Sequence, residues 1–413
     1  MSRARGTWIA AAAAAVVLGI SFYALGHWLE QGLLSDVGGY QERAASIRAG
    51  DVPYRDFAFE YPPAALAPML LPAYMSWSYA TSFAALMGVC GAACIAVSAS
   101  ALRAVGADVD RTWAALLAIG VAPLVLGSLF DTRFDLWPTL LAVGALAALV
   151  RERPVLSGAL LGLGFAAKLW PAVLLPIGLA YLWRRRGRAS ALTHLAAFVA
   201  VAAACFLPFV IIAPHGLRAM FADQLGRPLQ VESLGAAVLM AAEHLGLRPL
   251  TTIDSHGAQA LSGRGAGLAA NLSTLLEVAT VVAIWVVFAR RRNPNREAVL
   301  LAAAAAVAAL VAFDRVLSPQ YLIWIVPFIP LVRGWRGVYA SGLLFLALGL
   351  TQTWFPWHYW SLATDHAPPW SWYLLVRDVA LVLIAGVLLF ELSRVRDSEA
   401  GTARWPAARR AGA

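Results

Sequence analysis

Carboxylates and tyrosines are concentrated in one segment near the N-terminus, between two strongly apolar stretches. Asp36 and Tyr40 lie in LLSDVGGY, and Asp56, Glu60 and Tyr61 lie in PYRDFAFEYPP. An ionised carboxylate can remove the proton from an attacking hydroxyl group, so these acids are candidates for a general base. Asp36 could instead cap a helix. The residues alone do not decide among Asp36, Asp56 and Glu60.

A second set of candidate residues is basic. Lys168, the only lysine in the chain, stands in GFAAKLWP inside an otherwise apolar stretch. Arg133 lies between two aspartates, the second being Asp135, and Arg315 follows Asp314 in FDRVLSPQY. Arginine and lysine bind phosphate groups well. The structural alternatives are a local salt-bridge cluster around Arg133 and a snorkelling anchor for Lys168.

Several common catalytic motifs are missing from the sequence. GALLGLGFAAK at 158–168 lacks the GxxxxGK spacing of a Walker loop, and neither HExxH nor a Cys/His metal spacing occurs. Cys90, Cys94 and Cys205 lie in apolar stretches, which indicates packing rather than a disulfide framework. We therefore expect no required cofactor, although carboxylates near a phosphate could hold a divalent metal.

The composition is that of a membrane protein. Of the 413 residues, 61% are hydrophobic and 13% are charged, whereas soluble domains are roughly a quarter charged. Twelve apolar stretches are candidate membrane-crossing helices, and the first is predicted to be a retained helix rather than a signal peptide. They are 7–29, 80–102, 112–129, 136–150, 155–167, 170–183, 190–213, 267–289, 297–313, 321–332, 337–354 and 372–392. We predict an all-α polytopic integral membrane protein of about 12 helices.

The basic residues predict the orientation of these helices. The formal net charge is +9, and the arginines cluster in short loops that the positive-inside rule places in the cytoplasm. Both RERP at 151–154 and RRRGR at 184–188 are basic, so an even number of crossings must separate them. We therefore predict two short helices within 155–183 that turn at 168–171. Both termini then lie inside, and the tail 393–413 is predicted to be disordered.

The remaining loops face outward, and the whole chain, 1–413, forms a single transmembrane domain. The first outer loop, 30–79, contains a predicted short helix at 38–49 and an interfacial segment at 64–79. The other large loop is 214–266. The smaller outer loops are 130–135, 168–171, 314–320 and 355–371. Together they predict an outer-face pocket with carboxylates on one wall and cations on another. Nucleotide sugars are cytoplasmic, so a glycosyl transfer there needs a lipid-linked donor such as a polyprenyl-phosphate sugar.

In this light the sequence resembles the multi-spanning GT-C glycosyltransferases, and most closely the glycosyltransferase 87 group of polyprenyl-phosphate-mannose-dependent α-mannosyltransferases. The segments that carry the resemblance span nearly the whole chain in the expected order. They are Asp36 with Tyr40, GDVPYRDFAFEYPP at 50–63, RFDLWP at 133–138, GALLGLGFAAKLWPAVLLP at 158–176 and SPQYLIWIVP at 318–327. The fold that the resemblance implies is a GT-C-type bundle with an active site built from its outer loops.

The resemblance also implies a reaction and residue roles. A sugar, mannose first, would pass with inversion from a β-linked polyprenyl phosphate to an envelope glycolipid or lipoglycan. Asp36 would be the base, with Asp56 and Glu60 as the other candidates. Lys168, Arg133 and Arg315 would neutralise the leaving phosphate. The residues expected to bind sugar or acceptor are Tyr40, Tyr61, Asp135, Gln320 and His358. Some relatives carry His at the position of Gln320, so hydrogen bonding to sugar is its expected role.

Two alternatives remain open at this point. A related enzyme could transfer arabinofuranose from its polyprenyl phosphate, and sequence patterns do not separate the two sugars. A lipid-linked-sugar flippase or transporter would instead predict charges near mid-bilayer and inverted repeats, and we find no repeat. The protein is expected to be a monomer in a bacterial plasma membrane with its site facing outward. Its partners would be membrane lipids, donor and acceptor, with no nucleic acid.

Overall fold

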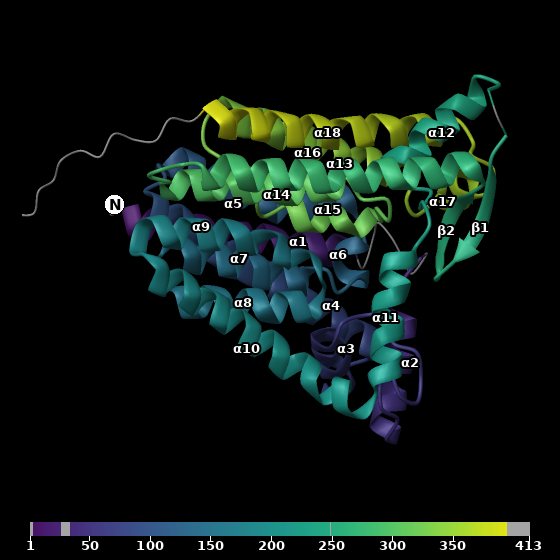
Figure 1. The fold of residues 1–413 in the computed structure, drawn as a ribbon, viewed down its shortest axis with the longest axis horizontal. Coiled ribbons are helices and arrows are strands. Elements are labelled where there is room, and N and C mark those ends of the chain that lie inside the picture. The colour runs from purple at the N-terminus through teal and green to yellow at the C-terminus, as the bar shows by residue number, and fades with distance from the viewer. Residues whose placement is uncertain (1–2, 26–33, 248, 395–413) are drawn as a thin grey trace, which may run out of the picture.

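The structure is a computed structural model that describes residues 3–25, 34–247 and 249–394. Most of the predicted tail 393–413 therefore lies outside the described residues. The described chain folds into helices that run largely side by side, with one small β-hairpin at an end of the bundle (Figure 1). Within the described residues, seven helices are long and apolar enough to cross a membrane. They are α1 Arg3–Ala24, α4 Tyr79–Val105, α5 Val109–Leu126, α10 Arg188–Ile212, α13 Arg264–Ala289, α14 Arg296–Phe313 and α18 Trp370–Arg394.

The other predicted spans correspond to α16 and to shorter apolar helices. Beyond the seven, the bundle contains α7 Leu136–Val150, α8 Pro154–Ala167, α9 Leu175–Arg186, α15 Leu322–Ile325 and α16 Trp335–Trp354. Short 3₁₀ turns interrupt the chain at η4 Trp170–Leu174, η5 Pro319–Tyr321 and η6 Ile329–Leu331. The prediction of a polytopic helical membrane protein is confirmed. The count of twelve crossings stays a prediction, because several of these helices are shorter than a membrane is thick.

The chain turns back at Lys168, as the basic loops predicted. Helix α8 ends at Ala167, Lys168 has extended backbone angles, and Pro171 begins the η4 turn into α9. The two ends of this hairpin lie together, because Arg186 Nη1 is 3.6 Å from Glu152 Oε2. Fourteen residues of helix span about 21 Å, whereas the hydrocarbon core is about 30 Å thick. Helix α8 is therefore shorter than the hydrocarbon core is thick.

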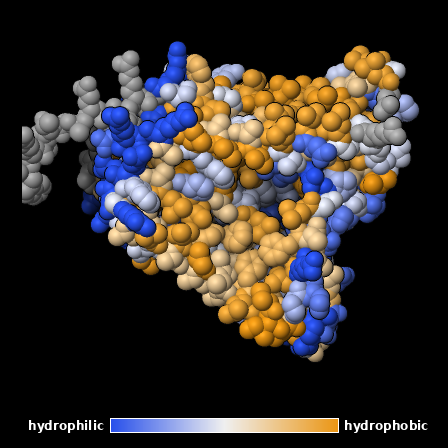
Figure 2. Space-filling view, in the orientation of Figure 1, coloured by the Kyte–Doolittle hydropathy of each residue, from blue (hydrophilic) through white to orange (hydrophobic). Residues whose placement is uncertain are grey.

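Ion pairs bring the arginine-rich ends of the helices together at one end of the bundle. Arg111 at the start of α5 contacts Glu297 at the start of α14, with Nη1 2.6 Å from Oε1. Arg296 Nη2 is 3.6 Å from the Oε1 of Glu152, which also contacts Arg186. Arg336 pairs in the same way with a carboxylate of α18. Figure 2 shows hydrophilic residues gathered at this end, and a broad hydrophobic face beside it.

The opposite end of the bundle is covered by the two large loops. The first contains α2 Val37–Ala49, which confirms the predicted short helix, then η2 Pro63–Ala65, α3 Leu66–Leu70 and η3 Leu71–Tyr74. The second contains α11 Pro214–Gly226, α12 Leu234–His244, and the antiparallel strands β1 Thr251–Ser255 and β2 Ala258–Ser262, with Ile253 opposite Ala260. Short helices α6 Leu129–Thr132 and α17 Tyr359–Ala363 complete this end.

Helix α11 packs closely against the first loop. A Cβ atom on Gly216 would lie 1.8 Å from the backbone oxygen of Tyr54, so only glycine permits this approach. Gln224 Nε2 donates a hydrogen bond to the backbone oxygen of Glu60 at 2.8 Å. Arg227 Nη2, just beyond the helix, is 3.6 Å from the Glu60 carboxylate. These contacts hold the two large loops together as the rim of a cavity.

Candidate active site

A cavity of about 530 Å³ lies at the loop-covered end of the bundle. Its walls come from segments far apart in the sequence, including the start of α2, the turn after α8, the end of α11, the middle of α13 and the turn after α14. Of the predicted site residues, six line it: Asp36, Tyr40, Tyr61, Asp135, Lys168 and Gln320. Figure 2 shows a hollow with hydrophilic residues inside it, opening among hydrophobic ones. Charged and lipid-like surfaces therefore meet in one cavity.

The first wall is built around Asp36. Its Oδ2 is 3.0 Å from Arg133 Nε and accepts a hydrogen bond from the Tyr40 hydroxyl at 3.2 Å. Asp36 occupies the cap position of α2, but its side chain makes no capping hydrogen bond. The side chain therefore faces the cavity rather than the helix end. Burial raises the pKa of Tyr40, which keeps that hydroxyl protonated as a donor to Asp36.

Arg133 forms an ion pair with Asp36 but does not itself line the cavity. Its side chain is buried, and its Nη2 also donates a hydrogen bond to the backbone oxygen of Leu34 at 2.6 Å. Both partners precede α2, so Arg133 fixes the start of that helix. The role of Arg133 that fits this geometry is orientation of the carboxylate.

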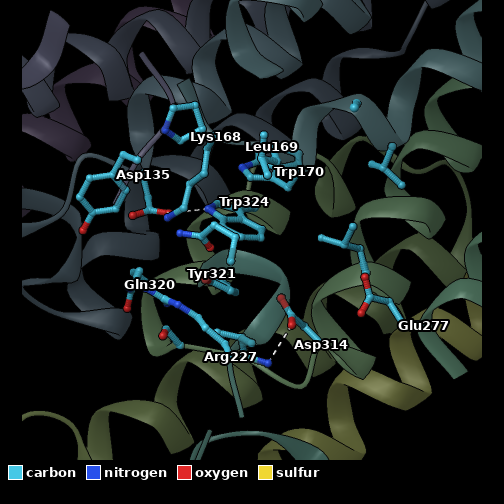
Figure 3. A pocket seen from close by; sticks show the side chains of 18 of the residues that line it. Asp135, Lys168, Leu169, Trp170, Arg227, Glu277, Asp314, Gln320, Tyr321 and Trp324 are labelled. Atoms are coloured by element: carbon cyan, nitrogen blue, oxygen red, sulfur yellow. Dashed lines mark hydrogen bonds and ion pairs between the residues drawn. The ribbon is translucent and has the colours of Figure 1, made fainter. Parts of the chain in front are cut away.

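The second wall is built around Lys168. Its Nζ is 2.6 Å from Asp135 Oδ1, and the indole nitrogen of Trp324 donates to the same oxygen at 2.6 Å (Figure 3). Three aromatic rings surround the amine: the ring centres of Phe134, Tyr321 and Trp324 lie 5.2, 4.9 and 5.0 Å from Nζ. Asp135 is 1% exposed. A buried aspartate thus fixes the direction of an ammonium group that borders the cavity.

Arg227 is a cavity cation that the sequence did not single out. It follows α11, and Figure 3 shows its side chain between Gln320 and Asp314. Its Nε atom is buried and has no hydrogen-bond partner within the described residues. Its guanidinium interacts with Asp314 (Figure 3) and lies 3.6 Å from the Glu60 carboxylate. A guanidinium with spare donors at a cavity wall is well suited to bind an anion.

The segment that carries Arg227 is held by backbone hydrogen bonds. Leu229 accepts from Leu261 N of β2 at 2.8 Å, and Gln230 N donates to the backbone oxygen of Arg315 at 2.9 Å. Gln230 Nε2 also donates to the Ser318 hydroxyl at 2.7 Å. No local sequence motif marks this residue, because only the hairpin and the turn after α14 bring it to the cavity.

Glu277 is a second residue missed in the sequence, although a signal was present. It is the only acidic residue in the apolar stretch 267–289, and such a residue inside a span is a functional hypothesis by default. It lines the cavity from the middle of α13, and Figure 3 shows it next to Asp314, which follows α14. Because α13 is long and apolar enough to cross a membrane, the charges of the site extend to the middle of a candidate span.

Five predicted residues do not line the cavity: Asp56, Glu60 and His358, and the arginines Arg133 and Arg315. Asp56 lies in an exposed turn, where its Oδ2 accepts from Val52 N at 2.7 Å. A side-chain hydrogen bond from Arg55, and then this backbone bond, lower the pKa of Asp56 to about 2. Glu60 pairs with Arg43 at 3.0 Å. His358 is exposed and stacks on Trp370, with ring centres 3.9 Å apart.

The other two are the arginines predicted to bind phosphate. Arg133 stands behind Asp36, as described above. Arg315 donates to the backbone oxygen of Leu225 and so joins the turn after α14 to the end of α11. Arg227 occupies the place at the cavity wall that Arg315 was expected to fill. Among the described residues, no group of three or more His, Cys, Asp or Glu side chains could hold a metal ion.

The protein is therefore a multi-pass helical membrane protein with a cavity that is lined by a carboxylate, cations and an apolar wall. Residues 59–319, more than half of the chain, match the model of glycosyltransferase family 87. The chain belongs to this family and is a glycosyltransferase. The matched range includes Lys168, Arg227 and Glu277 but not Asp36, so the assignment of Asp36 depends on geometry.

Comparison with solved structures finds the crystal structure of ArnT from Cupriavidus metallidurans bound to undecaprenyl phosphate. The two chains share 14% sequence identity with a TM-score of 0.49, and the match covers 95% of this chain and 78% of that chain. No curated protein matches the chain.

Proposed function

We propose that this glycosyltransferase transfers a sugar, mannose first, from a polyprenyl-phosphate donor to an envelope glycolipid or lipoglycan. The observation that carries the proposal is that one cavity has a carboxylate wall, a wall with two cations and an apolar wall. Asp36 stands on one wall and the cations Lys168 and Arg227 on another. A soluble sugar nucleotide would need no lipid-facing wall, whereas a lipid-linked sugar needs one beside its phosphate.

The apolar wall comes mainly from one face of α13. Val278, Val281, Val282 and Trp285 line the cavity at helical spacing. Val278 and Val282 are 55% and 41% exposed, so this wall continues onto the outer, hydrophobic surface of the bundle. An isoprenoid chain can lie along this face while its phosphate reaches the charged residues.

The proposed chemistry assigns a task to each group. Asp36 removes the proton from the acceptor hydroxyl while its oxygen attacks the anomeric carbon. The bond between that carbon and the phosphate oxygen breaks, and its electron pair leaves with the phosphate. Lys168 and Arg227 neutralise the leaving phosphate. A phosphate needs no protonation to leave, so one carboxylate is sufficient, unlike the paired acids of a glycosidase. Attack opposite a β-linked phosphate gives an α-linked product.

Asp135, Tyr40, Tyr61 and Gln320 have supporting roles in this proposal. Asp135 directs the Lys168 amine, and Tyr40 donates to the base. Tyr61 and Gln320 line the space beside them, where sugar hydroxyls need hydrogen-bond partners.

The arginine-rich end of the bundle supports an outward-facing site in a bacterial plasma membrane. Helices α7, α8 and α14 each run between that end and the cavity. By the positive-inside rule the arginines lie in the cytoplasm, so the cavity opens toward the other side. There a lipid-linked donor is the accessible form of an activated sugar.

A single-turnover assay with synthetic polyprenyl-phosphomannose tests the proposal. Asp36→Asn should lower transfer by at least about 100-fold, the usual scale for a lost general base. Asp56→Asn, a matched change outside the cavity, should leave transfer unchanged. Binding of polyprenyl phosphate to Asp36→Asn, monitored by the fluorescence of the cavity tryptophans, shows whether that variant is folded. Near wild-type transfer by a folded Asp36→Asn would contradict the proposal.

Two additions to the same assay address donor and metal. A panel containing polyprenyl-phosphoarabinofuranose beside the mannose donor decides which sugar is accepted. Parallel reactions with and without EDTA decide whether a divalent metal is needed, and we expect transfer to persist in EDTA.

A further inference from the structure

Two carboxylates of the cavity have no task in the proposed chemistry. Glu277 projects from the middle of α13 and Asp314 from the end of α14, and both line the cavity beside Arg227 (Figure 3). An acidic side chain within a membrane helix is costly. Packing alone would favour an apolar residue at position 277, because Val278, Val281 and Val282 already form that wall.

The position of these carboxylates is at the boundary between the charged and apolar walls. Asp314 interacts electrostatically with Arg315, Arg227 and Lys168. The last two are the cations proposed to neutralise the leaving phosphate. Glu277 interacts in turn with Asp314 and Arg315. Asp314 Oδ1 also accepts from Val316 N at 2.8 Å, which fixes its direction. Both carboxyl groups therefore lie beside the cations of the cavity, and Glu277 adjoins the apolar face of α13.

The proposed reaction changes the charge of the lipid. The donor is a phosphodiester with one negative charge. After the anomeric carbon–oxygen bond breaks, the remaining lipid is a phosphomonoester, and the proton of the acceptor hydroxyl is on Asp36. A phosphomonoester has a second pKa of about 6, so at a pH of about 8 it carries two negative charges. Two cations without nearby acids would therefore hold the product more tightly than the donor.

We propose that Glu277 and Asp314 select the singly charged lipid phosphodiester over its doubly charged monoester product, and so promote product release. This inference depends on the proposed function. Repulsion from a fixed carboxylate is about twice as large for a dianion as for a monoanion at the same place. The carboxylates therefore weaken product binding more than donor binding. The released lipid can return to the bilayer along the Val278 and Val282 face of α13.

The test measures binding of two lipids at a pH of about 9.5, where the monoester is a dianion and both carboxyl groups are ionised: polyprenyl phosphate, and its methyl phosphodiester, a monoanion. Tryptophan fluorescence reports binding, because Trp285 and Trp324 line the cavity. Glu277→Gln should tighten the dianion about tenfold and the monoanion about threefold or less, by the factor of two in charge. Asp314→Asn should act in the same direction. Glu42→Gln, an exposed change on α2 outside the cavity, should alter neither.

Inhibition of transfer by added polyprenyl phosphate gives a second measurement, in which Glu277→Gln should lower the ratio of the inhibition constant to the donor KM about threefold. Equal tightening of both lipids, or no change for both variants, would overturn the inference. Asp314→Asn decides the matter if Glu277→Gln does not fold. Failure of the proposed function would give a different result: the wild-type protein would transfer sugar from no lipid donor. That result does not depend on Glu277 or Asp314.

Discussion

The buried pair of Lys168 and Asp135 allows a structural role to be separated from a chemical one. The two side chains are 14% and 2% exposed, and their charged atoms are 2.6 Å apart. Lys168→Met would leave the carboxylate of Asp135 buried with only the Trp324 indole as a partner. Removing one member of a buried ion pair costs about 3–5 kcal/mol. We expect Lys168→Met to be destabilised by about that amount.

Neutralising the partner as well should restore most of this stability. When Lys168→Met is combined with Asp135→Asn, no charge remains unpaired, and the amide oxygen of the new side chain can still accept from Trp324. Lys168→Met/Asp135→Asn should therefore unfold at a higher temperature than Lys168→Met alone. Transfer should stay at least about 100-fold below wild type in both, because neither supplies a cation to the leaving phosphate.

The assay is thermal unfolding in detergent at one scan rate, followed by transfer from the lipid-linked donor. Lys168→Arg is the control that keeps the positive charge. A double variant no more stable than Lys168→Met would refute the reasoning about the unpaired carboxylate. A double variant with wild-type transfer would refute the role of Lys168 at the phosphate.

Two further predictions concern the elements around the cavity. Gly216→Ala should destabilise the protein by about 1–3 kcal/mol and lower transfer, because the added Cβ atom would lie 1.8 Å from the Tyr54 backbone oxygen. Gly226→Ala on the same helix is the control and should be neutral, because its Cβ atom would have nothing within 4 Å. Equal unfolding temperatures for the two variants would contradict this prediction. Burial raises the pKa of Glu232 from 4.5 to about 7. The folded state therefore keeps a proton that the unfolded chain loses, and stability should fall by about 3 kcal/mol as pH rises from 4.5 through 7. Glu232→Gln should remove that part of the pH dependence of the unfolding temperature, and an unchanged pH profile would refute the assignment.

The distribution of arginines predicted the most informative part of the fold. Two basic loops, 151–154 and 184–188, required an even number of crossings, and the structure has the turn at Lys168 with Glu152 and Arg186 in contact. The turn could be predicted because the charge of each loop and the length of each apolar stretch follow directly from the sequence. Helix length also limited the prediction, because the 14 residues of α8 are too few to cross the hydrocarbon core, so the depth of Lys168 cannot be predicted from the sequence.

The site was only partly predictable, for reasons that differ between residues. Asp36, Asp135 and Lys168 stand beside predicted helix ends, where a charge next to an apolar stretch is conspicuous. Arg227 is brought to the cavity by long-range pairing with β2 and the turn after α14, which leaves no local pattern. Asp56 looked equivalent to Asp36 in sequence. It is turned away because Arg55 and the Val52 backbone bind its carboxylate in an exposed turn.

The proposed function depends most on where the lipid phosphate binds. A density map of the wild-type protein with polyprenyl phosphate tests this directly. The phosphorus atom should lie between Lys168 and Arg227, with the first isoprene units along Val278, Val281 and Trp285 of α13. Phosphate density at the arginine-rich end of the bundle, or a chain leaving the cavity along another helix, would contradict the proposed function.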